Sequence, residues 1–270
     1  MSRSSASEVA EFRCPDGASL RYSTAGDGPP VVLIHGFGLD AAMWEPQWPA
    51  LRKHHRAIRY DLRGYGGSTL PEGAYTHVDD LLALLAFLRA QPAHLVGLSM
   101  GGRVALQLAL QEPAAVRSLT LVDSVLDGYR MSDAWLQSWR RIVATAKGGD
   151  LPGAKQLWRR HEVFAPALAR AEVAAPLEAM LARYSGWHWL QTDQDRVPAR
   201  PAIELLPTLT IPALIVVGAL DLPDFQAIAR RLAAEMPQAT LRVIAGAGHM
   251  ANMEAPDQFG ALLLEHLAKA

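Results

Sequence analysis

The stretch that decides the fold is His94-Leu-Val-Gly-Leu-Ser-Met-Gly-Gly102. It begins as a short apolar run typical of a buried strand, and it leads into residues 100–110, whose apolar side chains recur at helical spacing. At the junction lies the pattern Gly-x-Ser-x-Gly, centred on Ser99, in the strand-to-helix setting where it makes a tight turn that exposes a nucleophilic serine. Gly97 and Gly101 leave room for that strained backbone. The alternative is a flexible glycine-rich loop with an ordinary serine, but the flanking strand and helix favour the nucleophile.

Apolar runs and helical segments alternate on both sides of this turn. The runs expected to form buried strands are residues 31–34, 57–60, 94–96 and 119–122. Segments of helical period separate them, at residues 76–89 and 100–110. The alternation predicts repeated βαβ units and therefore an α/β fold with a mostly parallel sheet. Residues 11–15 and 18–23 flank Pro-Asp-Gly and predict an antiparallel hairpin at the edge of that sheet.

The alternation stops after residue 122. From about Ser124 to Leu206 only helical segments interrupted by prolines appear, and five of the seven tryptophans lie in this stretch. We therefore expect a helical cap at residues 124–206, inserted into a core domain formed by residues 1–123 and 207–270. The alternation then resumes, with strands expected at 213–217 and 241–244 and helices at 225–236 and 256–267.

A histidine that could activate the serine follows one of these later strands. A serine hydroxyl is a weak nucleophile at neutral pH, so it needs a base to accept its proton. His249 ends the sequence Gly-Ala-Gly-His directly after the strand expected at 241–244. Because glycines suit a loop that must carry an imidazole over the sheet edge, we take His249 as the general base.

Three aspartates are candidates for the acid that orients this histidine. In this fold the acid lies between the serine and the histidine along the chain. Asp221 follows the strand expected at 213–217 and ranks first. Asp123 ends an earlier strand and stays open as an alternative acid, as does Asp224. Asp224 fits better as a loop carboxylate or a helix N-cap carboxylate ahead of Phe225.

Two backbone N–H groups are candidates for an oxyanion hole. One belongs to Met100, which directly follows Ser99. The second should come from the loop after the strand at 31–34, where the sequence is His-Gly-Phe-Gly. Glycines on both sides allow the amide of Phe37 to turn inward, and its ring can supply pocket wall. We expect His35 to hold this loop by hydrogen bonds.

Composition and charge exclude several classes of protein. The chain has 270 residues, of which 50% are hydrophobic and 20% charged, as in a folded domain rather than a disordered or fibrous chain. Lys and Arg number 26 against 27 Asp and Glu, a net charge of −1, so no basic excess favours nucleic acid or an anionic membrane. The single cysteine, Cys14, excludes a disulfide scaffold and a cysteine-rich metal site.

The sequence lacks the patterns of a secretory signal, a membrane span and a metal site. Residues 1–8 lack the apolar core of a secretory signal, and no run approaches the roughly 20 apolar residues of a membrane span, so we expect a cytoplasmic protein. His54 and His55 are adjacent rather than spaced for one helix face, and no His-Glu-x-x-His pattern occurs. We expect no metal, no cofactor, no nucleic acid or membrane partner, and a monomer or homodimer that binds a small molecule.

Five motifs together resemble the serine hydrolases of the α/β-hydrolase superfamily. They are His35-Gly-Phe-Gly38, Asp61-Leu-Arg-Gly-Tyr-Gly-Gly-Ser68, Gly97-Leu-Ser-Met-Gly-Gly102, Gly218-Ala-Leu-Asp221 and Gly248-His249, and they extend over nearly the whole chain. The resemblance implies an eight-stranded, mostly parallel sheet with a helical cap after the sixth strand. It also implies that Asp61 and Arg63 brace a structural loop rather than form a catalytic pair.

The resemblance narrows the expected chemistry to acyl transfer. Dehalogenases and epoxide hydrolases of this superfamily would carry an aspartate in place of Ser99. Carbon–carbon bond hydrolases usually have a tryptophan after the catalytic histidine, where this chain has Met250. The elbow resembles those of enol-lactonases and carboxylesterases, so we expect hydrolysis of an ester or lactone. A carbon–carbon bond hydrolase and a non-catalytic small-molecule receptor of the same fold remain the alternatives.

Side chains of the cap are expected to line the substrate pocket. The candidates are Trp135, Trp139, Trp187, His188 and Trp189, together with Met250 after the histidine. Aromatic residues in a helical insertion more often serve as packing than as pocket wall, so packing stays open as an alternative for each of them.

Overall fold

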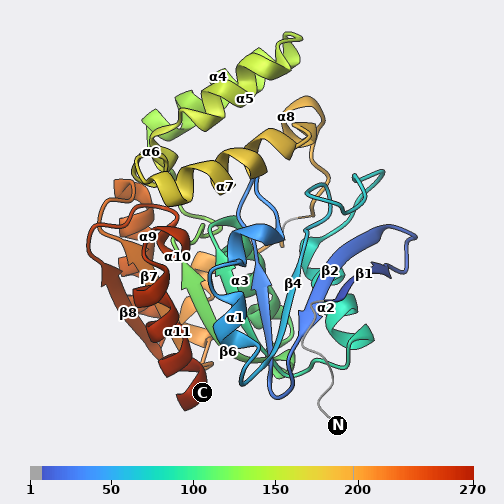
Figure 1. Ribbon diagram of the computed structural model, residues 1–270, viewed down its shortest axis with the longest axis vertical. Helices are drawn as coiled ribbons and strands as arrows, with labels where there is room; N and C mark the ends of the chain where they lie inside the picture. Colours follow the sequence, from blue (N-terminus) through green and yellow to red (C-terminus); the bar gives the residue numbers. More distant parts are fainter. Residues whose placement is uncertain (1–7, 197) are drawn as a thin grey trace.

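Eight strands form one sheet in the computed structural model, which describes residues 8–196 and 198–270 (Figure 1). The strands are β1 (Glu8–Arg13), β2 (Ser19–Ala25), β3 (Pro30–Ile34), β4 (Arg56–Tyr60), β5 (Ala93–Leu98), β6 (Val116–Val122), β7 (Ala213–Gly218) and β8 (Ala239–Ile244). Their order across the sheet is β1-β2-β4-β3-β5-β6-β7-β8. The first two pairs are antiparallel and the other five are parallel, as the sequence predicts.

The sheet is built around β5, which lies between β3 and β6 with all six of its residues buried. A strand covered on both faces reads as a continuous apolar run, which is why its sequence shows no alternation. The flanking helices are α1 (Trp48–Leu51), α2 (His77–Phe87), α3 (Met100–Gln111), α9 (Pro223–Glu235), α10 (Ala251–Glu254) and α11 (Pro256–Lys269). Helix α3 packs on the central strands and α9 on β7 and β8.

The edge hairpin is confirmed, with its strands displaced from the predicted positions. Strand β1 ends at Arg13, before the predicted end at Pro15, because the chain already turns there. The N–H of Cys14 donates to the carbonyl of Ala18 (2.7 Å), and Gly17 adopts a φ of 94° that favours glycine. The polar segment 1–7 lies outside the described residues, as does most of the stretch on which the expectation about a secretory signal depends.

The segment between β6 and β7 is helical and lies at the top of Figure 1, above the sheet. Its α-helices are α4 (Asp133–Lys147), α5 (Leu151–Arg159), α6 (Ala165–Leu168), α7 (Ala171–Arg183) and α8 (Trp187–Leu190). Of the described residues from 124 to 206, none lies in a strand, and Asp195 makes an isolated bridge to Tyr75. We call the segment 124–206 the cap. None of the helices in the described part of the chain is long and apolar enough to cross a membrane.

Side-chain bonds tie the cap to the rest of the chain. Asp224 on α9 accepts hydrogen bonds from the N–H (3.2 Å) and the hydroxyl (2.6 Å) of Ser132, the N-cap residue of α4. Asp224 does not cap its own helix, so the N-cap role that the sequence suggested as one alternative is wrong. Pro223 occupies the first position of α9, so the N-cap position falls on Leu222 and Asp224 lies within the first turn.

Candidate active site

Ser99 occupies a strained turn between β5 and α3. Its φ of 54° and ψ of −114° lie outside the usual regions for a residue with a side chain, as the predicted elbow requires. The neighbouring glycines allow the turn, because a side chain at Gly97 would collide with the carbonyl of Gly101 and one at Gly101 with the carbonyl of Ile34. The N–H of Ser99 donates to the carbonyl of Val122 (2.9 Å), which fixes the elbow to the neighbouring strand β6.

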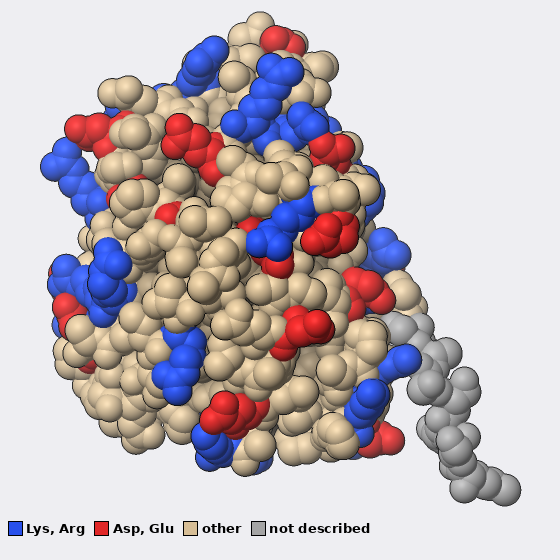
Figure 2. All heavy atoms as spheres, turned by 60° about the vertical axis from the view of Figure 1, so that its left-hand side comes forward, with Lys and Arg blue, Asp and Glu red and all other residues tan. Residues whose placement is uncertain are grey.

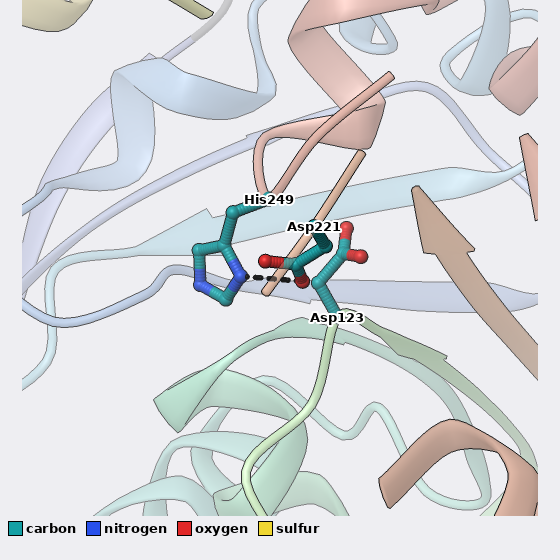
Figure 3. Close-up of side chains that lie close together, drawn as sticks. All are labelled: Asp123, Asp221 and His249. Atoms are coloured by element: carbon teal, nitrogen blue, oxygen red, sulfur yellow. Dashed lines mark hydrogen bonds and ion pairs between the residues drawn. The ribbon is translucent and has the colours of Figure 1, made fainter. Parts of the chain in front are cut away.

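His249 and Asp221 are joined by a hydrogen bond in a buried setting (Figure 3). Nδ1 of His249 lies 2.9 Å from Oδ2 of Asp221, and the side chains are 6% and 0% exposed. An ionised carboxylate can only accept, so this bond places a proton on Nδ1 and leaves Nε2 able to accept one. Oδ1 of Asp221 accepts from the N–H of Leu222 (2.7 Å), which fixes the carboxylate.

The loop that carries His249 is braced by Glu254, a residue that the sequence analysis missed. Its carboxylate accepts from the N–H of Gly248 (2.8 Å) and from the N–H of Met250 (3.0 Å), on both sides of the histidine. Burial raises the pKa of Glu254, and these N–H groups oppose the rise. The sequence has no period or motif that indicates this bracing, because it depends on the short helix α10 folding back on the loop.

Asp123 lies close to Asp221 and His249, but it makes no hydrogen bond to the histidine among the described residues. It is fully buried after β6, and its Oδ1 accepts from the N–H of Gly218 (2.8 Å). Asp123, Asp221 and His249 are residue types that can bind a metal ion, and their donor atoms lie within 4.8 Å of one another. However, Nδ1 of His249 and Oδ1 of Asp123 are already engaged in hydrogen bonds. The set is therefore arranged to orient the imidazole.

The two predicted oxyanion residues, Phe37 and Met100, belong to segments that adjoin Ser99. Met100 is the first residue of α3, so its N–H has no acceptor within the helix. A Cβ built on Gly36 would lie 3.5 Å from the Cβ of Ser99, which brings the loop of Phe37 close to the serine. Both Phe37 and Met100 line the same cavity as Ser99.

Hydrogen bonds hold the loops that the sequence identifies as structural. Nδ1 of His35 donates to the carbonyl of Gly36 (2.8 Å), and Nε2 accepts from the N–H of Leu62 (2.9 Å). Asp61 accepts from the N–H groups of Ala41 and Gly67 (both 2.8 Å). Neither side chain lines the cavity of Ser99, as the bracing role requires.

Arg63 belongs to the same structural group. Its guanidinium donates to both carboxylate oxygens of Asp80, at 2.8 and 2.5 Å, and to Asp16 at 2.6 Å. Burial raises the pKa of Asp80, and the adjacent guanidinium opposes the rise.

A largely apolar cavity of about 410 Å³ opens over Ser99 and His249. The predicted pocket residues Trp135, Trp139 and Met250 line it. Its apolar side chains are Phe37, Leu39, Leu98, Met100, Val125, Trp135, Leu136, Trp139, Trp158, Val163, Phe164 and Met250. Trp135 also lines a separate groove on the surface between α4, α5 and α9.

Trp187, His188 and Trp189 do not line this cavity, contrary to their selection as pocket residues. The ring of His188 stacks on Tyr65, with centroids 4.4 Å apart, and burial lowers the pKa of His188 to about 4. Trp189 is fully buried and packs edge-on against Tyr184. The packing alternative therefore describes them, because His188 and Trp189 contact the wall residue Phe37 and Trp187 packs on His188, without lining the cavity themselves.

One cationic side chain lies among the described residues of the cavity wall. Arg103 follows Ser99 by one turn of α3 and pairs with Asp195 of the cap (2.7 Å) and with Asp127 (3.9 Å). Asp193, also in the wall, accepts from the hydroxyl of Tyr75 (3.0 Å). Carboxylates thus outnumber the guanidinium that they surround.

Comparisons with known proteins identify the family of this fold. A model of the alpha/beta hydrolase fold family matches residues 29–256. The dihydrolipoyllysine-residue acetyltransferase component of the acetoin cleaving system from Pseudomonas putida is 33% identical over 94% of this chain and 68% of that protein. The enol-lactonase from Burkholderia xenovorans superimposes with a TM-score of 0.83 at 26% identity, covering 96% of this chain and 100% of that one. A thermophilic esterase from Thermogutta terrifontis gives 0.72 at 28% identity, covering 97% and 98%.

Proposed function

Since the chain belongs to the alpha/beta hydrolase family, we propose that it hydrolyses a carboxylic ester or lactone through an acyl-enzyme on Ser99. The observation that carries the proposal is one shared cavity. Ser99 reaches it from a strained turn, and His249, held by Asp221 through Nδ1, reaches it with Nε2 free to accept a proton.

In the first half of the reaction, Nε2 of His249 removes the hydroxyl proton as the Oγ of Ser99 attacks the substrate carbonyl carbon. The negative charge then develops on the carbonyl oxygen, where the N–H groups of Phe37 and Met100 would stabilise it. The imidazolium is stabilised by Asp221, and it protonates the departing alcohol oxygen as the C–O bond breaks. The product of this half is an ester of Ser99.

In the second half, water takes the place of the alcohol. His249 accepts a proton from the water as its oxygen attacks the acyl carbon, and returns that proton to Oγ of Ser99 as the acid leaves. In a lactone the alcohol and the acid belong to one molecule, so the same two steps open the ring.

The cavity wall supports an uncharged substrate with a bulky apolar group. The cavity is lined largely by aromatic and aliphatic side chains, against which polar groups would lose their hydration. Arg103 is already paired with Asp195, so a substrate carboxylate would find no free cation in the wall. Structural relatives named as an esterase and an enol-lactonase support ester or lactone cleavage as the reaction class.

Turnover of p-nitrophenyl butyrate tests the proposal. We expect hydrolysis by the wild type, its loss in Ser99→Ala, and little change in Ser138→Ala, a control on α4 outside the cavity. A fluorophosphonate probe should label Ser99 alone, and EDTA should leave the rate unchanged. Absence of turnover together with tight ligand binding would favour the receptor alternative. Retained activity in Ser99→Ala would refute the acyl-enzyme.

A further inference from the structure

A second carboxyl group lies beside the Asp221–His249 pair, and the reaction above does not use it. Figure 3 shows the carboxyl group of Asp221 between the imidazole of His249 and the carboxyl group of Asp123. Asp123 is 0% exposed and the side chain of Asp221 is also 0% exposed, so water does not screen one from the other. Two carboxylates this close and this dry cannot both ionise without a large cost.

The hydrogen bonds around Asp123 leave one of its oxygens without a partner. Oδ1 accepts from the N–H of Gly218 (2.8 Å), but Oδ2 is a buried oxygen with no hydrogen-bond partner among the described residues. Such an orphan is rare in a folded protein, because it loses its bonds to water and gains none. A proton on Oδ2 would turn it into a donor, and the carboxylate of Asp221, which has an oxygen within 4.8 Å of a carboxyl oxygen of Asp123, is a nearby acceptor.

We propose that Asp123 is a neutral carboxylic acid in the resting protein and that its proton on Oδ2 is shared with the carboxylate of Asp221. Asp123 is then a positioning residue that acts on His249 through Asp221. One negative charge faces the imidazole instead of two, which matches the single positive charge that it carries during the reaction.

Electrostatics around the site support this assignment. Burial, and after it the negative charge of Asp221, raises the pKa of Asp123 well above its ordinary value. The N–H of Gly218 and, after it, the N–H of Ala251 oppose the rise, and neither is a hydrogen-bond partner of Oδ2. Among the described residues, the ionisable groups of Glu254, from α10, and His161, from the cap, also interact with His249, and burial favours the neutral form of both. Arg170 of the cap lies 3.7 Å from the carboxylate of Glu254.

The geometry explains why Asp221 rather than Asp123 orients the histidine. The backbone of Asp123 is fixed to β7, since its N–H donates to the carbonyl of Val216 (2.9 Å) while its Oδ1 accepts from Gly218. Asp123 thus crosslinks the ends of β6 and β7, next to the loop that carries Asp221.

Infrared spectroscopy at neutral pH tests the protonation state directly and needs no substrate. The difference spectrum between wild type and Asp123→Asn should contain the C=O stretch of one protonated carboxyl group. Asp257→Asn, which changes an exposed residue on α11, is the matched control and should give no such band. Only carboxylate bands in the Asp123→Asn difference would overturn the proposal.

The titration of His249 gives a second readout. Asn can accept from Gly218 and donate to Asp221 as a neutral Asp does, so Asp123→Asn should leave the pKa of His249, followed by NMR, within about 0.3 units of wild type. Loss of an ionised neighbour would instead lower it by about one unit or more, which would refute the proposal. Asp123→Ala, which removes the donor, should raise it, because Asp221 becomes a stronger partner for the imidazolium.

The Asp221→Asn protein provides a test that leaves Asp123 in place. If Asp123→Asn does not fold, the carbonyl band should still be present in wild type and should shift in Asp221→Asn, because an amide oxygen is a weaker acceptor. No difference in the carbonyl region between these two proteins would overturn the proposal. None of these outcomes depends on ester hydrolysis, so the inference and the proposed function fail separately.

Discussion

Nδ1 of His249 donates to Oδ2 of Asp221 over 2.9 Å, and both side chains are shielded from solvent. The two residues follow neighbouring strands, β8 and β7, whose carboxyl ends meet at one edge of the sheet. This bond selects the tautomer in which Nε2 can act on Ser99.

Replacement of Asp221 by asparagine should lower kcat by about three to four orders of magnitude with the fold retained. The amide favours the wrong imidazole tautomer and stabilises the imidazolium poorly. Esterase kinetics and circular dichroism of the same preparation check both halves of this expectation. Asp224→Asn should change kcat by less than about fivefold, because an amide oxygen can still accept from Ser132. Equal losses in the two variants would contradict the assignment of the acid.

Two tryptophans of the cap should separate substrate preference from stability. Trp139→Ala removes part of the cavity wall and should shift KM and the preferred acyl length. Trp189→Ala empties a fully buried site outside that wall, and should cost about 3–5 kcal/mol of unfolding free energy with the preference unchanged. Melting curves and rates on p-nitrophenyl esters from acetate to octanoate measure both effects. An altered length preference in Trp189→Ala alone would show that the wall is assigned wrongly.

A free carboxylate on the substrate should lower kcat/KM at least about tenfold. The matched pair is mono-p-nitrophenyl adipate, which carries a free carboxylate, and methyl p-nitrophenyl adipate, in which that carboxylate is a methyl ester. The two compounds differ in charge and little in length. The anion must lose hydration in a cavity whose one guanidinium is already paired, close to the carboxylate of Asp193. Asp193→Asn should reduce the difference in kcat/KM between the two esters. Equal rates for both esters in wild type would contradict the charge argument.

Stability should fall as the pH is lowered from about 6.5 to about 4, in part because of His94. Burial, and after it the charge of Arg117, lowers the pKa of His94 to about 4. The unfolded chain takes up a proton at this residue near pH 6.5, which the folded protein does not bind until about pH 4. The stabilising effect of the neutral ring is therefore complete above pH 6.5 and is lost over that window.

Urea unfolding at several pH values between 4 and 7 measures this effect. Carboxyl groups titrate over the same range, so the readout is the difference between wild type and His94→Gln. The unfolding free energy of the variant should fall less steeply as the pH is lowered. The slope of unfolding free energy against pH should differ from wild type by an amount that corresponds to at most one bound proton. Parallel curves for the two proteins would exclude His94 as a contributor.

The sequence predicts the elbow, the base and the acid because each follows a strand. Runs of buried β-branched and aliphatic residues locate the strand ends, and parallel strands bring those ends together whatever the details of packing. The order of Ser99, Asp221 and His249 along the chain then assigns their roles. The sequence leaves both Asp123 and Asp221 as candidates for the acid, since both follow strands and only the loop conformation decides which carboxylate reaches the imidazole.

The cap was less predictable because helical period gives the apolar face of a helix but not its partner. Trp139 and Trp189 both look like cap aromatics in the sequence, yet Trp139 lines the cavity, whereas Trp189, on α8, is fully buried outside the cavity wall. The bracing role of Glu254 could not be predicted from the sequence for a similar reason. A carboxylate that braces a loop through backbone N–H groups has partners of any residue type, so no spacing indicates it.

The indole of Trp135 borders both the cavity over Ser99 and the surface groove between α4, α5 and α9. Trp135 is the residue that the linings of the cavity and of this groove share. A smaller side chain at position 135 would therefore open a second entrance to the cavity, from the groove, without altering the nucleophile, the base or the acid. The size of the residue at position 135 would then control the entry of long substrates without changing the acyl-transfer steps.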